Sequence, residues 1–129
     1  MRIMTPTPEG IEMAAGAIHA GEVVVYPTET VYGLGVNPFN VDAVDRLFAL
    51  KRRDAGKPLL LIVADMEQLS DVIAKHQEEA LRYAETFWPG PLSLLFPKSD
   101  RLPGFVTAGS DKVCVRCPSS EVARRLCRA

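Results

Sequence analysis

Short apolar runs typical of strands alternate with segments of helical periodicity, and this alternation constrains the fold more than any other feature of the sequence. The strand-like runs are residues 22–26, 59–63, 92–96 and 113–117, and helical patterns begin near residues 8, 41, 66, 77 and 121. Strands that alternate with helices predict an α/β domain, and their irregular spacing argues against a plain doubly wound repeat. The first run, which ends at a proline, is predicted to be a buried strand, and residues 51–57 are predicted to form a charged loop.

Capping residues mark where the helices begin. Thr7 followed by Pro8 combines a hydroxyl cap with a proline at the first helical position, and Gly21 ends this helix. Side chains suited to the same role precede three later helices: Asn40, Asp65 (with Gln68, in a pattern that resembles a capping box) and Ser120.

The length of 129 residues suits one compact domain and is too short for two ordinary ones. Apolar residues make up 47% of the chain, enough for a core, and charged residues make up 24%, so disorder is not expected. No apolar run approaches the roughly 20 residues of a membrane-spanning helix, and residues 1–10 lack the apolar core of a signal peptide. We therefore expect a cytoplasmic protein with no membrane association.

Charge is unevenly distributed along the chain, although the net charge is only −1. Residues 46–57 and residues 112–129 each hold five basic side chains against one acidic side chain, whereas residues 65–85 hold six acidic against two basic ones. Such segregation favours a face that attracts phosphates or carboxylates. Ordinary solvated helix faces give the same pattern, so charge alone leaves both interpretations open.

The sequence PTETVYGLG at residues 27–35 is the most unusual stretch of the chain. It follows a predicted strand directly, gathers three hydroxyl groups and a carboxylate within five residues, and ends in two glycines. Binding groups collect in loops at strand ends, and glycine allows a backbone to approach a ligand closely. A turn in which Thr and Glu side chains satisfy local backbone donors explains the same residues.

A basic segment, KRRDAGKP at residues 51–58, lies between a predicted helix and a predicted strand. Arginine makes forked two-point contacts and lysine supplies a compact point charge, so the segment suits polyphosphate binding. It does not match the GxxxxGK[ST] pattern of a P-loop. A solvated surface loop is the alternative interpretation.

Arg116 lies within an apolar strand and shares a strand face with Cys114. A guanidinium embedded in a sheet requires an anion, because an unpaired buried charge is very unfavourable. That anion is either an internal Asp or Glu or the carboxylate of a ligand.

The three cysteines do not form a complete set of metal ligands. Cys114 and Cys117 form a CxxC, but residues three apart on a strand face opposite sides. No second CxxC or histidine pair completes a tetrahedral site. We expect no metal site, and the odd number of cysteines, of which Cys127 is the third, argues against a disulfide framework.

Together, PTETVYGLG, a KxR element followed by Lys-Pro-Leu, WPGPLSLLF and VxVRxP resemble the YrdC family of threonylcarbamoyl-AMP synthases, over about residues 11–126. The resemblance implies a YrdC/RibB-like α/β fold: a twisted open mixed sheet with flanking helices around a concave basic cavity. It also implies an enzyme, a nucleotidyltransferase that joins L-threonine, bicarbonate and ATP into threonylcarbamoyl-AMP and releases pyrophosphate. The product serves the threonylcarbamoyladenosine modification of tRNA.

Positions that match the family's motifs imply roles for individual residues. Thr30, Tyr32 and Arg116 correspond to L-threonine-binding positions, with Arg116 holding the substrate carboxylate. The implied nucleotide-binding residues are Lys51, Arg53, Lys57 and Lys112, the last at a position where a hydroxyl residue is more usual. No catalytic residue beyond these positioning groups is assigned, and ATP with Mg²⁺ is the expected nucleotide substrate.

The resemblance further implies tRNA or double-stranded RNA and downstream tRNA-modifying proteins as partners. A non-catalytic YciO-like module that binds double-stranded RNA or tRNA is the alternative function. The intact 27–35 element together with Arg116 favours the synthase, because binding of RNA or phosphate alone requires neither. Family members continue with a Ser/Thr-rich SxSAN segment, so we expect residues 1–129 to be a single YrdC-like domain that is incomplete at its C-terminus.

Overall fold

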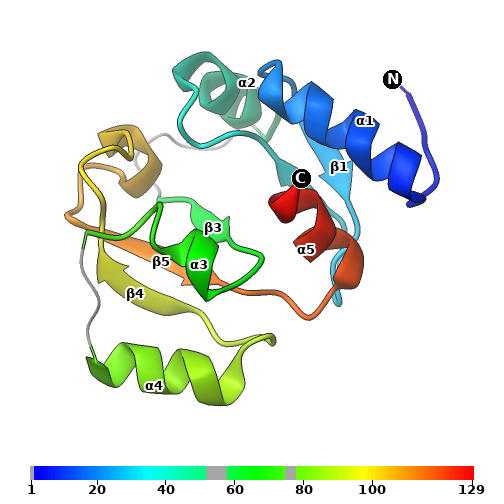
Figure 1. The fold of residues 1–129 in the computed structure, drawn as a ribbon. Coiled ribbons are helices and arrows are strands. Elements are labelled where there is room, and N and C mark those ends of the chain that lie inside the picture. Colours follow the sequence, from blue (N-terminus) through cyan, green and yellow to red (C-terminus); the bar gives the residue numbers. More distant parts are fainter. Residues whose placement is uncertain (1, 52–57, 75–77) are drawn as a thin grey trace.

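The computed structural model describes residues 2–51, 58–74 and 78–129, which fold into helices around two small sheets (Figure 1). The helices are α1 (Pro8–His19), α2 (Val41–Lys51), α3 (Met66–Leu69), α4 (Glu78–Phe87), α5 (Glu121–Arg128) and the 3-10 helix η1 (Gly104–Thr107). The strands are β1 (Val24–Tyr26), β2 (Gly33–Gly35), β3 (Leu60–Ile62), β4 (Leu94–Pro97) and β5 (Lys112–Arg116). None of the helices within the described ranges combines the length and the apolar character that crossing a bilayer requires. The predicted α/β class is confirmed.

The larger sheet is built around β5. β3 pairs with β5 in parallel and β4 pairs with it in antiparallel orientation, so the sheet is mixed, as predicted. β1 and β2 form a separate antiparallel ribbon in which Tyr26 lies opposite Gly33. In Figure 1 the three-stranded sheet lies at the lower left with α3 and α4, whereas β1, α1 and α2 lie at the upper right and α5 comes between the two groups.

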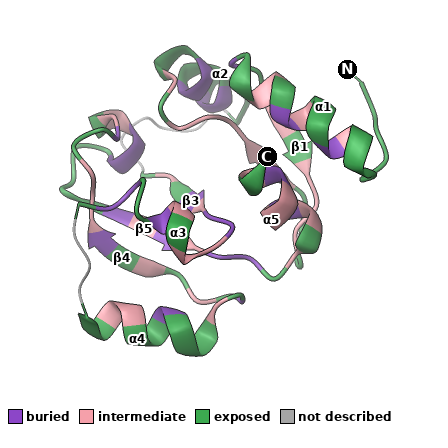
Figure 2. Cartoon of the chain, in the orientation of Figure 1, coloured by how far each residue is buried: buried purple, intermediate pink, exposed green. Residues whose placement is uncertain are grey.

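The hydrophobic core lies largely on one face of the three-stranded sheet. Alternate residues of a strand face opposite sides, so Val113 and Val115 of β5 are buried in the core, whereas Cys114 and Arg116 share the other face and are only partly buried. Phe96 of β4 is fully buried in the same core. Figure 2 shows purple and pink along β5 and mostly green along α4, which covers the sheet with a single narrow apolar stripe.

The capping residues act largely as the sequence predicts. Thr7, Asn40 and Ser120 each accept a hydrogen bond from the backbone amide three residues later, at 3.1–3.2 Å. Asp65 likewise accepts from Gln68 N at 2.9 Å. The Gln68 side chain, however, accepts from the amide that precedes Asp65, at 2.7 Å, so the reciprocal half of the capping box is shifted by one residue.

The structure corrects the prediction that the first strand is buried. β1 is three residues long and Val25 is 57% exposed, because within the described residues β1 pairs with β2 alone, and this ribbon has one face open to solvent. β2 and η1 were not expected: β2 contains two glycines, which have low strand propensity, and pairing with β1 overrides that preference. Of the predicted charged loop, Lys51 is the last residue of α2, and residues 52–57 lie outside the described residues.

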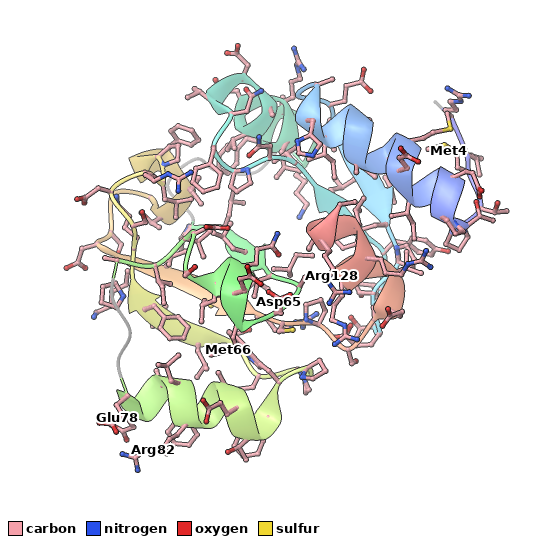
Figure 3. All side chains as sticks on the ribbon, in the orientation of Figure 1. Met4, Asp65, Met66, Glu78, Arg82 and Arg128 are labelled. Carbon is pink, nitrogen blue, oxygen red and sulfur yellow. The ribbon has the colours of Figure 1, made fainter. Side chains whose placement is uncertain are left out.

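α5 connects the two halves of the molecule through contacts at both of its ends. At the start, Ser120 Oγ donates a hydrogen bond to the carbonyl of Pro27 at 3.1 Å. At the end, Gln68 Nε2 donates to a backbone carbonyl in the last turn at 2.6 Å, and Arg128 Nε lies 3.8 Å from Asp65 Oδ2. Figure 3 shows the Asp65 and Arg128 side chains side by side between α3 and α5. α5 thereby holds the start of the 27–35 element against the larger sheet.

The contact between the Tyr26 ring and the glycines of β2 gives a test of this packing. A Cβ at Gly35 would come within 2.8 Å of Tyr26 Cε1. We predict that Gly35→Ala lowers the free energy of unfolding by about 1–3 kcal/mol, as measured by urea denaturation. Gly16→Ala in α1 is the control: its Cβ meets nothing within 4 Å, and it should raise stability by about 0.5–1 kcal/mol. An equal change in the free energy of unfolding for Gly35→Ala and Gly16→Ala would contradict the contact between Tyr26 and Gly35.

Candidate functional site

A cavity of about 510 Å³ lies between the β1–β2 ribbon and β3 with the end of β5. Its walls combine apolar side chains of β3, α2 and α5 with polar groups from residues 28–32, here called the 28–32 loop. Four residues selected from the sequence line it together: Thr30, Tyr32, Lys51 and Arg116. The volume falls in the range of roughly 300–1,000 Å³ that is usual for small-molecule sites.

The 28–32 loop is held in shape by its own side chains. Thr28 Oγ1 donates a hydrogen bond to the carbonyl of Val31 and accepts one from Thr30 N at 3.2 Å, a turn that short hydroxyl side chains commonly close. Thr30 and Tyr32 nevertheless line the cavity, with Tyr32 largely exposed at its edge. The local-turn and the ligand-binding interpretations of this element are therefore compatible. The loop pairs its own backbone hydrogen-bonding groups and also presents side chains to the cavity.

Arg116 has an internal anion as its partner. Its Nη2 lies 2.9 Å from Oε1 of Glu29, and the two side chains are 17% and 21% exposed. The sequence left open whether the partner is an internal carboxylate or a ligand, and the structure supplies the internal one. Arg116 Nε is buried and has no hydrogen-bond partner among the described residues. A guanidinium has five N–H donors, so this ion pair leaves Arg116 with capacity to bind a second anion.

Tyr26 belongs to the same site, although no sequence motif selects it. Its ring covers Gly33 and Gly35 and lines the cavity. Burial raises the pKa of its hydroxyl, the neighbouring Cys127 raises it further, and Arg116 acts in the opposite direction. The Tyr26 hydroxyl therefore stays neutral at pH 7 and is available as a hydrogen-bond donor.

The basic residues assigned to the nucleotide are placed differently from one another. Lys51 lines the cavity from the last turn of α2. Lys112 is exposed at the start of β5, opposite Pro97, and is not among the residues that line the cavity. At about 3.3 Å per residue, it lies about 13 Å along the strand from Arg116. Arg53 and Lys57 lie outside the described residues, so their roles stay predictions.

Three further polar residues of the site carry no independent sequence signal. Gln68 and Asp71 line the cavity from α3 and the turn after it; the sequence marks Gln68 only as part of a helix-capping pattern, and no motif marks Asp71. Glu29 stands within the 27–35 element, but its pairing with Arg116 depends on two segments that meet only in the folded chain. The one indirect signal was the expectation that Arg116 needs an anion, which allowed an internal Asp or Glu as its partner.

The thiols of Cys117 and Cys127 contact backbone carbonyls near β3. Cys117 Sγ lies 3.4 Å from the oxygen of Ala64, and Cys127 Sγ lies 3.8 Å from that of Ile62. Burial raises the pKa of Cys127 to about 12. All three cysteines are free thiols, and the part of the chain that the structure describes holds no cluster of three or more His, Cys, Asp or Glu side chains suited to a metal ion.

Comparison with known proteins identifies the family. A sequence model named for the Sua5, YciO and YrdC proteins, and described as telomere recombination, matches residues 16–129. The chain belongs to this family. The threonylcarbamoyl-AMP synthase of Pyrococcus abyssi is 47% identical over 116 residues, and that of Methylococcus capsulatus is 41% identical over 118 residues. These matches take in 90% and 92% of this chain, but only 34% and 63% of the relatives, so the chain spans a third of one and less than two thirds of the other.

A solved structure of the family matches the fold closely. P. abyssi Sua5 complexed with L-threonine superposes on 98% of this chain with a TM-score of 0.89 and 43% sequence identity, over 37% of its own length. The family and the mixed open α/β fold that the sequence motifs predict are therefore confirmed.

The raised pKa of Cys127 predicts how stability depends on alkaline pH. The unfolded chain ionises this thiol near pH 9 and the folded protein only near pH 12. The unfolded state therefore loses the proton first, and the free energy of unfolding falls in this window by up to about 1.4 kcal/mol per pH unit. We predict a shallower fall for Cys127→Ala in urea titrations at several pH values. Lost packing shifts the curve equally at every pH, so parallel curves for the two proteins would contradict the assignment.

Proposed function

We propose that this chain supplies the amino-acid and nucleotide site of a threonylcarbamoyl-AMP synthase. The proposed reaction joins L-threonine, bicarbonate and ATP into threonylcarbamoyl-AMP, releases pyrophosphate and one water, and yields a product that serves tRNA modification. The observation that carries the proposal is the convergence of Thr30, Lys51 and Arg116, which come from three separate segments, on one cavity of about 510 Å³. The 43% identity to a Sua5 protein whose solved structure is a complex with L-threonine supports it.

The cavity offers each part of L-threonine a partner of suitable chemistry. The planar guanidinium of Arg116 matches a carboxylate in two-point geometry. The Thr30 hydroxyl can both donate and accept, so it suits the substrate hydroxyl. Apolar side chains such as Ile62 and Leu126 also line the cavity and suit the methyl group. A site that pairs a substrate hydroxyl rejects analogues without it more strongly than an apolar pocket does.

The nucleotide would lie beside Lys51, which lines the cavity. Arg53 and Lys57, the other nucleotide-binding residues that the family motifs imply for this segment, lie outside the described residues. In the proposed step a carbamate oxygen attacks the α-phosphorus as pyrophosphate leaves, so the protein contributes mainly alignment and neutralisation of charge. Mg²⁺ that accompanies ATP is usually held by phosphate oxygens, waters and one or two protein carboxylates, and it would neutralise phosphate charge. Asp71, a carboxylate on the cavity wall, is a candidate ligand of this type.

The direct test measures pyrophosphate release from ATP by this chain, with L-threonine and bicarbonate each omitted in turn. Release that requires both substrates supports the synthase. Release that is independent of L-threonine contradicts it. Tight, salt-sensitive binding of double-stranded RNA without any such release also contradicts it and favours the RNA-binding alternative.

Removal of the Arg116 guanidinium should weaken L-threonine binding specifically. We predict that Arg116→Ala costs about 1.5–3 kcal/mol of binding free energy, the usual value of a hydrogen bond to a charged group, as measured by isothermal titration calorimetry. Arg82→Ala is the matched control, because Arg82 is exposed on α4 and points away from the body of the molecule (Figure 3). Unchanged L-threonine affinity in Arg116→Ala would remove this residue from the site.

A further inference from the structure

We propose that Glu29 binds the ammonium group of the amino acid and makes the site specific for α-amino acids over other carboxylates. This inference rests on the proposed function and adds a second charged anchor beside Arg116. In the ligand-free protein, Glu29 and Arg116 neutralise each other. When the amino acid enters, its carboxylate binds Arg116 and its ammonium group binds Glu29.

The ion pair has spare capacity on both of its sides. Glu29 contacts Arg116 through Oε1, at 2.9 Å from Nη2, and this is the one ion pair or hydrogen bond of the Glu29 carboxylate among the described residues. An ionised carboxylate has about four lone-pair sites, so Glu29 can accept further hydrogen bonds. Arg116 Nε is also without a partner in the described part of the chain. The two charges therefore neutralise each other, while Arg116 keeps a free donor and Glu29 keeps free acceptor sites for a ligand.

One contact holds the Glu29 carboxylate beside Arg116, and a second holds the chain segment that carries Glu29. The ion pair joins the 28–32 loop to the end of β5. The hydrogen bond from Ser120 Oγ to the Pro27 carbonyl joins the same two segments a few residues further on. Thr30, the next residue after Glu29, lines the cavity, as does Arg116. Glu29 is not itself among the residues that line the cavity, but its carboxylate is paired with Arg116, which is, and Thr30 follows it in the chain.

Charge balance favours a zwitterion over a simple carboxylate at this pair. An α-amino acid has no net charge, so its insertion replaces one ion pair by two and leaves every charge with a partner. A ligand that carries a carboxylate alone displaces Glu29 from Arg116 and leaves the Glu29 charge unpaired. An unpaired charge that is even partly withdrawn from water is costly, and the Glu29 side chain is only 21% exposed. Ligands without an amino group therefore lose binding free energy, and this difference is the basis of the specificity.

The test compares two ligands that differ only in the amino group. L-Threonine and (R)-3-hydroxybutyrate share the carboxylate, the hydroxyl and the methyl group, and only L-threonine carries an ammonium group. Isothermal titration calorimetry measures both ligands on the unchanged protein, on Glu29→Gln and on Glu29→Asp. Glu121→Gln, which removes a charge from an ion pair with Arg124 on α5, is the matched control. Thermal unfolding of each variant checks that the fold is retained.

Glu29→Gln should weaken L-threonine binding roughly ten- to hundredfold, as expected for loss of a charged hydrogen-bond partner. Binding of (R)-3-hydroxybutyrate should stay equal or become tighter, because its carboxylate no longer competes with Glu29 for Arg116. Glu29→Asp, which keeps the charge, should retain part of the preference for L-threonine. Glu121→Gln should bind both ligands as the unchanged protein does.

Each other outcome overturns a defined part of the account. Equal weakening of both ligands by Glu29→Gln would mean that Glu29 only orients Arg116, and equal tightening would mean that it only competes with ligands. Either result overturns the ammonium site. If the unchanged protein binds L-threonine no better than (R)-3-hydroxybutyrate, this inference fails while the proposed function stands. If it binds neither ligand, the proposed function fails as well.

Discussion

A guanidinium that is mostly withdrawn from water needs an anion, and Arg116 imposes this need on the whole site. β5 pairs on both sides and buries alternate residues in the core, so Arg116 emerges at the end of the central strand with its side chain only 17% exposed. The Glu29 carboxylate meets the need in the ligand-free protein. This ion pair brings together two segments that are distant in sequence, and the cavity lies where they meet.

The position of Glu29 depends on packing that lies outside the ion pair itself. The Tyr26 ring rests on the glycines of β2, which leaves no room for a side chain at Gly35 and sets the shape of the ribbon from which the 28–32 loop extends. Ser120, the cap of α5, also donates a hydrogen bond to the Pro27 carbonyl just before this loop. The Ser120 side chain thus caps the start of α5 and also anchors the segment that leads into the 28–32 loop. These contacts fix the supports of the site, and the proposed binding mode requires only that Glu29 and Arg116 gain new partners.

Local signals in the sequence were sufficient for much of this fold, and the rest depended on tertiary contacts. Thr7, Asn40 and Ser120 cap helices as predicted, because a cap needs only residues three apart. The joint position of Thr30 and Arg116 followed from the family motifs, and both line the cavity. The exposure of β1 and the existence of β2 could not be predicted, because each strand depends on the other rather than on its own propensity. The partner of Arg116 stayed open for the same reason.

The most direct measurement of the central claim is a titration of ¹⁵N-labelled protein with L-threonine, followed amide by amide by NMR. A shared site for the 28–32 loop and Arg116 predicts that the largest shifts fall on residues 28–35 and on the amides around Arg116 and its neighbour Ile62 in β3. Amides of α4, on the far side of the core, should stay unchanged. Saturable shifts that avoid the 28–32 loop, or that affect it without affecting the end of β5, would contradict the account.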